Sequence, residues 1–232
     1  MPAVFIVGTD TGVGKTMVTG LLARYLSESG LSVVTQKWVE TGCSKKISED
    51  IKTHLALMKK NLSYIKGYRS NVSPYVFRAA CSPHLASSME QRQISSGKIK
   101  NSFKILSKRF DFVLVETAGG ALVPYRSRSL LIDLAKELHI PVLIVAGNKL
   151  GAINHTLLTV EAFKKRKMKI IGIIFNNPEK EKTAILRDNP RVVQSISAER
   201  VFGVLPRRKN HNVLYRKFLP IAKKIAKELK NG

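Results

Sequence analysis

Glycines, a lysine and a threonine stand together near the start of the sequence, in "GTDTGVGKT" at residues 8–16. Glycines let backbone N–H groups approach an anion closely, while a lysine ammonium and a threonine hydroxyl can hold phosphate oxygens and a magnesium ion. Five residues separate Gly8 from Gly14, whereas the common phosphate-binding loop (P-loop) has four at this place. The stretch predicts a nucleotide site with a lengthened loop. A glycine-rich turn that ends in Lys-Thr by chance is the alternative.

Further polar residues follow apolar runs along the chain. Glu116 ends the run "FDFVLVE" and precedes the small residues "TAGG". In nucleotide-binding α/β folds, a carboxylate at the end of a buried strand is where a magnesium ligand lies. Lys37, in "TQKWVETG", ends another such run and could face either the same site or solvent. From the residues alone, Asp50 before "IKTHLALM" is best explained as a helix N-cap, and His84 in "CSPHLASS" as a residue near a helix start.

Apolar runs that alternate with helical patterns are expected to position these residues. Runs that are apolar at consecutive positions suit strands covered on both faces. The alternation predicts one domain over residues 1–232 with a P-loop NTPase-like, three-layer α/β fold, in which helices flank a mostly parallel sheet. Ligands then bind at the carboxyl ends of the strands. The expected strands are 3–8, 32–39, 110–116, 141–147, 169–176 and 200–206, the expected helices are 15–28, 129–138 and 154–167, and the least regular stretches are 43–50 and 68–97.

The composition indicates the cellular compartment in which the protein is expected. The chain has 232 residues, of which 44% are hydrophobic, so it can bury a large core. Its two cysteines, Cys43 and Cys81, form neither a disulfide framework nor a zinc-site spacing, which favours a reducing compartment. The apolar stretch near the N-terminus is too short for a signal peptide or a membrane span. We therefore expect a cytoplasmic protein with no membrane partner.

The net charge of +24 raises the question of a nucleic-acid partner. Lysine and arginine are densest at 163–169, 206–211 and 222–230. In the last stretch, apolar residues recur at helical spacing while lysines fill the other face, as in a helix with a solvated side. The sequence contains no zinc-finger spacing and no aromatic-and-basic recognition strand. A nucleic-acid partner is therefore not favoured, although polyanion binding stays open.

Six segments, in order, resemble motifs of the dethiobiotin synthetase family. "GTDTGVGKT" is similar to that family's own P-loop, which also has five residues between the glycines. The resemblance covers nearly the whole chain and implies an ATP-dependent carboxylase and cyclase of biotin synthesis. The other five segments are "KWVETG", "SPYVFRAACSPHLAS", "VETAGGALVP", "GNKLGAINHTLLT" and "IIFNN".

The resemblance also implies roles for individual residues. Thr16, Asp50 and Glu116 would hold magnesium, and Lys37 would be the catalytic lysine, with Lys15 reaching the phosphates and the carbamate. Substrate would be bound by Thr11, Thr41 and, from the partner subunit of a homodimer, the counterpart of Asn154. The nucleotide would be bound by Gly12, Val13, Gly14, Lys15, Thr16, Met17, Asp50, Glu116, Thr117, Ala118 and Gly119, with Asn176 reading adenine and Pro206 framing the base.

The implied reaction joins CO2 to 7,8-diaminopelargonic acid and closes a ring, giving dethiobiotin, ADP and phosphate. Mg2+ would be its cofactor and ATP its co-substrate, with no prosthetic group. The alternative is a DNA-partitioning or DNA-positioning P-loop ATPase. Such proteins generally carry a lysine beside the first loop glycine, where this chain has Gly8-Thr9, and an aspartate where Glu116 stands.

Overall fold

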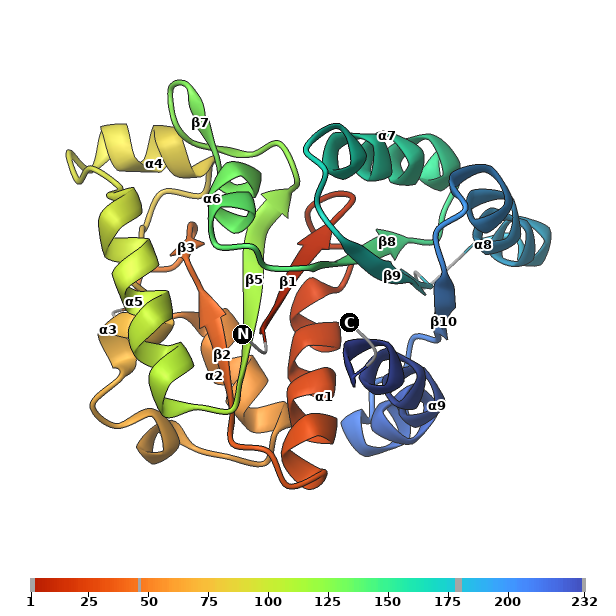
Figure 1. The fold of residues 1–232 in the computed structure, drawn as a ribbon, viewed down its shortest axis with the longest axis horizontal. Helices are drawn as coiled ribbons and strands as arrows, with labels where there is room; N and C mark the ends of the chain where they lie inside the picture. Colours follow the sequence, from red (N-terminus) through yellow and green to blue (C-terminus); the bar gives the residue numbers. More distant parts are fainter. Residues whose placement is uncertain (1–2, 46, 178–180, 231–232) are drawn as a thin grey trace.

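The computed structural model describes residues 3–45, 47–177 and 181–230. At its centre is a six-stranded sheet in the order β10-β9-β8-β1-β5-β2, and every pair of neighbours in it is parallel (Figure 1). The predicted fold class, a parallel sheet with helices on both sides, is therefore confirmed. The strands are β1 (Ala3–Gly8), β2 (Val33–Lys37), β5 (Phe112–Gly120), β8 (Val142–Gly147), β9 (Ile170–Asn176) and β10 (Val201–Leu205).

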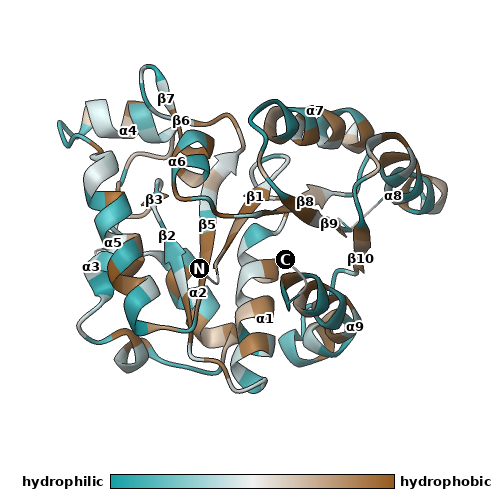
Figure 2. Cartoon of the chain, viewed as in Figure 1, coloured by the Kyte–Doolittle hydropathy of each residue, from teal (hydrophilic) through white to brown (hydrophobic). Residues whose placement is uncertain are grey.

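Helices cover both faces of the sheet because its strands are apolar on both faces. Along β1, Val4 and Ile6 pack towards α1 (Lys15–Glu28) and α9 (His211–Lys230). Phe5 and Val7 pack into the opposite core, to which α5 (Ser96–Arg109), α6 (Leu131–Glu137), α7 (Ala152–Lys165) and α8 (Thr183–Ser197) contribute. Figure 2 shows the result: the central strands are largely hydrophobic, while the outer sides of the helices are hydrophilic.

The strongest sequence patterns gave accurate boundaries. The helix predicted at 15–28 is α1 to the residue, and those predicted at 129–138 and 154–167 are α6 and α7, with ends shifted by one or two residues. All six strands occur where they were expected. The strand predicted to end at Glu116 continues as β5 to Gly120, although its burial falls after Thr117.

Several elements were not predicted. These are α5 and α8 among the helices, and most of the short elements in the stretches expected to be irregular, whereas α2 was expected only as the helix that Asp50 would cap. The bounds of the remaining elements are β3 (Val39–Glu40), α2 (Glu49–Leu57), the 3-10 helix η1 (Leu62–Ile65), α3 (Arg69–Val72), β4 (Tyr75–Val76), α4 (Pro83–Met89), β6 (Pro124–Arg126) and β7 (Ser129–Leu130).

The sheet register brings the polar residues together at one edge. Glu116 of β5 pairs with Lys37 of β2 on one side and with Ile6 of β1 on the other. The loop from β1 to α1 begins beside them, because β1 is the neighbour of β5. Among the described residues, no helix is both long and apolar enough to cross a membrane.

Candidate functional site

The P-loop connects β1 to α1 and has the geometry of an anion cradle. Gly12 and Gly14 have φ values of 74° and 95°, a region that L-residues rarely adopt. A Cβ atom at Gly8 would come within 2.9 Å of the Lys15 Nζ and within 2.7 Å of the Asp10 carbonyl oxygen, so a side chain there would fill the cradle. Because α1 begins at Lys15, the positive end of its dipole faces this loop. The residues present fit a bound phosphate.

Lys15 lies at the bottom of the cradle, where its ammonium donates to the Asp10 carbonyl oxygen at 3.1 Å. Burial and the nearby Lys37 ammonium lower the pKa of Lys15 from 10.5 to about 8, although Glu116 and Asp50 act in the opposite direction. Among the described residues, no carboxylate forms an ion pair with Lys15, and a bound phosphate could supply the missing negative charge.

The Lys37 ammonium forms ion pairs with two carboxylates. Its Nζ lies 2.6 Å from Asp50 Oδ2 and 2.8 Å from Glu116 Oε1, and it donates to the Thr117 carbonyl oxygen at 2.9 Å. Burial alone would lower the pKa of Lys37, but the two carboxylates outweigh burial and raise it. The ammonium is therefore held charged at the edge of the sheet.

Thr16 completes a cluster of oxygen atoms. Its hydroxyl lies 3.0 Å from Asp50 Oδ1 and 3.1 Å from Glu116 Oε1. Three such oxygens are a donor set of the kind that Mg2+ prefers, since this ion takes few protein ligands and completes its shell with phosphate and water. The described residues contain no cluster of three or more His, Cys, Asp or Glu side chains that could hold a metal by themselves. The set fits a magnesium ion that arrives with a nucleotide.

Glu116 is the most deeply buried member of this cluster, with 1% of its surface exposed. Burial alone would raise its pKa, but the charge of Lys37 and a hydrogen bond with His54 overcome this and lower it strongly. His54 Nε2 lies 2.8 Å from Glu116 Oε2. Sequence reasoning missed His54, although its position four residues after Asp50 would place both on one face of a helix.

A cavity of about 610 Å³ opens over this cluster. The P-loop and the segment before α4 both line the cavity. Residues predicted to bind nucleotide and residues predicted to bind substrate therefore lie in one cavity. Thr11 and Thr41, predicted to bind substrate, both line it. The other residues that line it are Gly12, Lys15, Thr16, Lys37, Glu40, Asp50, Ala80, Cys81, Ser82, Pro83, Ala118, Gly119 and Val123.

Asp50 and His84 can now be placed on their helices. The N-cap of α2 is Ser48, whose side chain accepts from the Ile51 N–H, and Asp50 lies inside the first turn. The interpretation of Asp50 as the N-cap is therefore wrong, and its carboxylate is free to face Lys37. His84 is the second residue of α4, near a helix start as predicted.

Eight predicted residues do not line the cavity: Val13, Gly14, Met17, Glu116, Thr117, Asn154, Asn176 and Pro206. Asn176 ends β9 and donates from its amide to the Val13 carbonyl oxygen at 2.9 Å, so it supports the P-loop. Pro206 directly follows β10 and is partly buried. Met17 packs against the core beneath α1, and Asn154 is exposed on α7. Thr117, besides its contact with Lys37, donates its hydroxyl to the Gly119 carbonyl oxygen at 3.1 Å.

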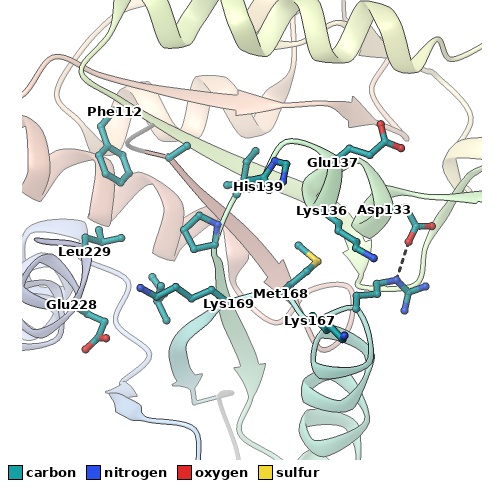
Figure 3. Close-up of a pocket in the computed structure, with 15 residues that line it drawn as sticks. Phe112, Asp133, Lys136, Glu137, His139, Lys167, Met168, Lys169, Glu228 and Leu229 are labelled. Atoms are coloured by element: carbon teal, nitrogen blue, oxygen red, sulfur yellow. Dashed lines mark hydrogen bonds and ion pairs between the residues drawn. The ribbon is translucent and has the colours of Figure 1, made fainter. Parts of the chain in front are cut away.

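A larger cleft, of about 950 Å³, lies at the opposite edge of the sheet (Figure 3). It is lined by residues at or near the starts of strands, among them Ala3, Phe112 and Lys169, and by the Asp133–Arg166 ion pair at 2.8 Å. Ligands of open α/β sheets bind at the carboxyl ends of the strands. The smaller cavity, which the P-loop, Lys37 and Asp50 line, is therefore the candidate active site.

The chain is similar to known proteins in sequence. Residues 2–212 match the family model described as an AAA domain. The chain is 39% identical over 187 residues to an ATP-dependent dethiobiotin synthetase of Haemophilus influenzae, covering 80% of this chain and 97% of that protein. It is 38% identical over 201 residues to the ATP-dependent dethiobiotin synthetase of Chlorobaculum tepidum, covering 87% of this chain and 83% of that one.

Solved structures show a similar fold. The ParA protein of pNOB8 bound to nonspecific DNA matches with a TM-score of 0.60 and 17% identity, covering 99% of each chain. The septum site-determining protein MinD of Pyrococcus horikoshii, complexed with Mg-ADP, matches with a TM-score of 0.59 and 17% identity, covering 99% of this chain and 95% of that one. At this level of identity the likeness extends to the fold and not to the activity.

Proposed function

The chain belongs to the family of ATP-dependent dethiobiotin synthetases, and from this premise we propose how its P-loop cavity makes dethiobiotin. The enzyme carries out the ATP-dependent carboxylation and ring closure of 7,8-diaminopelargonic acid with CO2 in biotin biosynthesis. The observation that carries our assignment of the site is the Lys37 ammonium, held at 2.6 Å from Asp50 and 2.8 Å from Glu116 in the cavity that the P-loop also lines.

The reaction passes through anions at each stage. One amine of the substrate attacks CO2 and forms a carbamate, ATP phosphorylates the carbamate oxygen, and the second amine closes the ring as phosphate leaves. We assign Lys15 to the phosphates and the carbamate, and Lys37 to the charge that develops on the carbamate and the transferred phosphoryl group. Both ammonium groups are already in place before the reaction, so little reorganisation is needed at the transition state.

The nucleotide is proposed to bind along the P-loop. Backbone N–H groups of Gly12, Val13, Gly14 and the first turn of α1 would receive its phosphates. Thr16, Asp50 and Glu116 would hold Mg2+, which neutralises phosphate charge when it is bound. At the other end, the Asn176 NH2 group is engaged by Val13, which leaves its carbonyl oxygen to accept from the adenine amino group, with Pro206 beside the base.

The diamine is proposed to bind in the part of the cavity lined by Thr11 and Thr41, whose hydroxyl groups can hydrogen-bond its polar ends. Asn154 is exposed on α7 and does not line this cavity. We assign it instead to the substrate of a second copy, which makes the functional unit a homodimer. The proposed compartment is the cytoplasm, where the free thiols of Cys43 and Cys81 would stay reduced.

Phosphate release tests this function. The purified chain is mixed with ATP and Mg2+, and the diamine and CO2 are each supplied or left out. We expect release only when both are present, because the phosphoryl group is transferred to a carbamate that needs both. ATP hydrolysis that ignores the diamine and increases with DNA would instead indicate a DNA-partitioning ATPase. Repeating the assay with GTP and CTP measures selectivity for the base.

A further inference from the structure

His54 is a buried histidine that contacts Glu116, one of the proposed magnesium ligands. None of its surface is exposed, and its Nε2 lies 2.8 Å from Glu116 Oε2. The other oxygen of the same carboxylate, Oε1, faces Thr16 at 3.1 Å and Lys37 at 2.8 Å. The two oxygens of Glu116 therefore have separate tasks: one contacts the cavity cluster, and the other is held by a histidine.

We propose that His54 is a positioning residue, which fixes the orientation of Glu116 and so sets the affinity of the site for the magnesium ion that accompanies ATP. This inference rests on the proposed function, because it takes Glu116 to be a magnesium ligand. Groups that hydrogen-bond a metal-binding carboxylate fix its geometry, and removing them typically weakens metal binding about 10- to 100-fold.

Hydrogen-bond chemistry defines the direction of the contact. An ionised carboxylate only accepts, so Nε2–H of His54 is the donor. Nδ1 is buried and has no hydrogen-bond partner among the described residues. The ring is therefore held at one nitrogen, by Glu116, and no second polar partner is present in the described structure to pull it towards another orientation.

Close packing of two helices places this ring. A Cβ atom at Gly20 of α1 would lie 3.2 Å from His54 Cα and 2.5 Å from Leu57 Cδ1, so the glycine allows α2 to approach α1. Thr16 is in the first turn of α1, and Asp50 precedes His54 by one turn on α2. The same helix pair thus carries two of the proposed magnesium ligands and the group that orients the third.

Substitutions of His54 can show whether this residue orients Glu116 or only fills space in the core. His54→Gln can place an amide N–H near the position of Nε2, whereas His54→Asn reaches only as far as Nδ1, and His54→Leu keeps much of the volume without any donor. We would measure Mn2+ binding by electron paramagnetic resonance, with ATP present and the diamine absent. ATP binding without metal and thermal unfolding serve as controls for the P-loop and the fold.

We expect Mn2+ binding to weaken about 10- to 100-fold in His54→Leu and His54→Asn, and His54→Gln to recover most of the wild-type affinity. Equal Mn2+ affinity in the Gln and Asn variants, or wild-type affinity in a folded Leu variant, would overturn the proposal. The phosphate-release assay on the wild-type protein tests the synthetase function separately, because the Mn2+ measurement includes no diamine and no turnover.

Discussion

At the scale of single residues, Lys37 is the group on which we propose that the chemistry depends. It is buried, its pKa is raised by the charges of Glu116 and Asp50 in spite of burial, and it lies in the cavity beside Lys15. An ammonium preorganised in a site with little water stabilises developing negative charge more than a solvated one does. Its removal should therefore affect the reaction more than it affects binding of ATP.

We expect Lys37→Ala to lower turnover about 10²- to 10³-fold, on the order of 3–4 kcal/mol, because one preorganised electrostatic partner of the transition state is lost. The measurement is kcat for dethiobiotin formation at saturating ATP. Lys45→Ala is the matched control, since Lys45 also contacts a carboxylate, Glu49 at 2.9 Å, but its side chain is 64% exposed. Near-normal turnover in Lys37→Ala would remove this residue from the mechanism.

Lys15 gives a prediction for stability against pH. Its pKa is about 8 in the folded, nucleotide-free chain, against 10.5 when unfolded. Between these values the unfolded chain holds a proton that the folded chain releases, so the free energy of unfolding should rise with pH. From pH 8 to pH 10 the contribution of this group is on the order of 2 kcal/mol.

Denaturant unfolding at several pH values, without nucleotide, measures this rise. Because other groups also titrate, the comparison is with Lys15→Met, in which the contribution should be absent. Parallel stability curves for the two proteins between pH 8 and pH 10 would contradict the lowered pKa.

The sequence indicated candidate residues of the site, but it indicated few of the residues that support them. Lys15, Thr16 and Glu116 stand at the junctions of strand, loop and helix, where side-chain type alone indicates a function. Asp50 needed the family resemblance, because a carboxylate at a helix start is usually a cap. His54 was missed because it stands in an apolar run and its partner, Glu116, is 62 residues away.

At the scale of elements, the strands that are buried on both faces of the sheet were the easiest to predict. All six strands of the sheet were expected, since consecutive apolar residues leave few alternatives. The unpredicted helices have weaker local signals. α5 carries five Lys and Arg residues in its fourteen, and α8 contains Pro190. These segments are helical because the sheet offers a surface on which their short apolar stripes can pack.

In the P-loop, two of the three glycines, Gly12 and Gly14, should differ in their tolerance of a side chain. A Cβ atom at Gly14 would lie 2.0 Å from Asn176 Nδ2, whereas at Gly12 it would meet nothing within 4 Å. Both have positive φ, so alanine at either costs about 1–2 kcal/mol in backbone strain. At Gly14 the Asn176–Val13 hydrogen bond must also break, which adds about 1 kcal/mol.

We expect Gly14→Ala to lower the free energy of unfolding by about 2–3 kcal/mol and to weaken ATP binding well beyond the effect of Gly12→Ala. Denaturant unfolding and ATP titration of both variants measure these effects. Similar losses of stability and of ATP affinity in the two variants would mean that the Asn176 side chain does not support the loop.

At the scale of the whole molecule, fold and charge say less about activity than the site does. ParA and MinD structures share this fold at 17% identity or below, yet the dethiobiotin synthetases are the relatives at 34–40% identity. The net charge of +24 spreads over many exposed lysines, including Lys136, Lys167 and Lys169 around the larger cleft. Neither the fold nor the charge therefore distinguishes this chain from a DNA-dependent ATPase, whereas the sequence relatives do.

The proposed role of Asn154 also predicts the oligomeric state of the protein. If Asn154 serves the substrate of a second copy, Asn154→Ala should raise the KM for the diamine several-fold, about 1 kcal/mol for one hydrogen bond, and leave ATP binding unchanged. Light scattering of the wild-type chain should give twice the mass of the 25.8 kDa protomer. An active monomer with an unaltered Asn154→Ala variant would exclude this arrangement.

Transfer of labelled carbon tests the central claim most directly. The wild-type chain and Lys37→Ala are supplied with ¹³CO2, 7,8-diaminopelargonic acid, ATP and Mg2+, and the product is analysed by mass spectrometry. We predict dethiobiotin that carries the label in its ureido carbonyl, formed by the wild type about 10²- to 10³-fold faster than by the variant. ATP consumption by the wild type without labelled dethiobiotin would contradict the account.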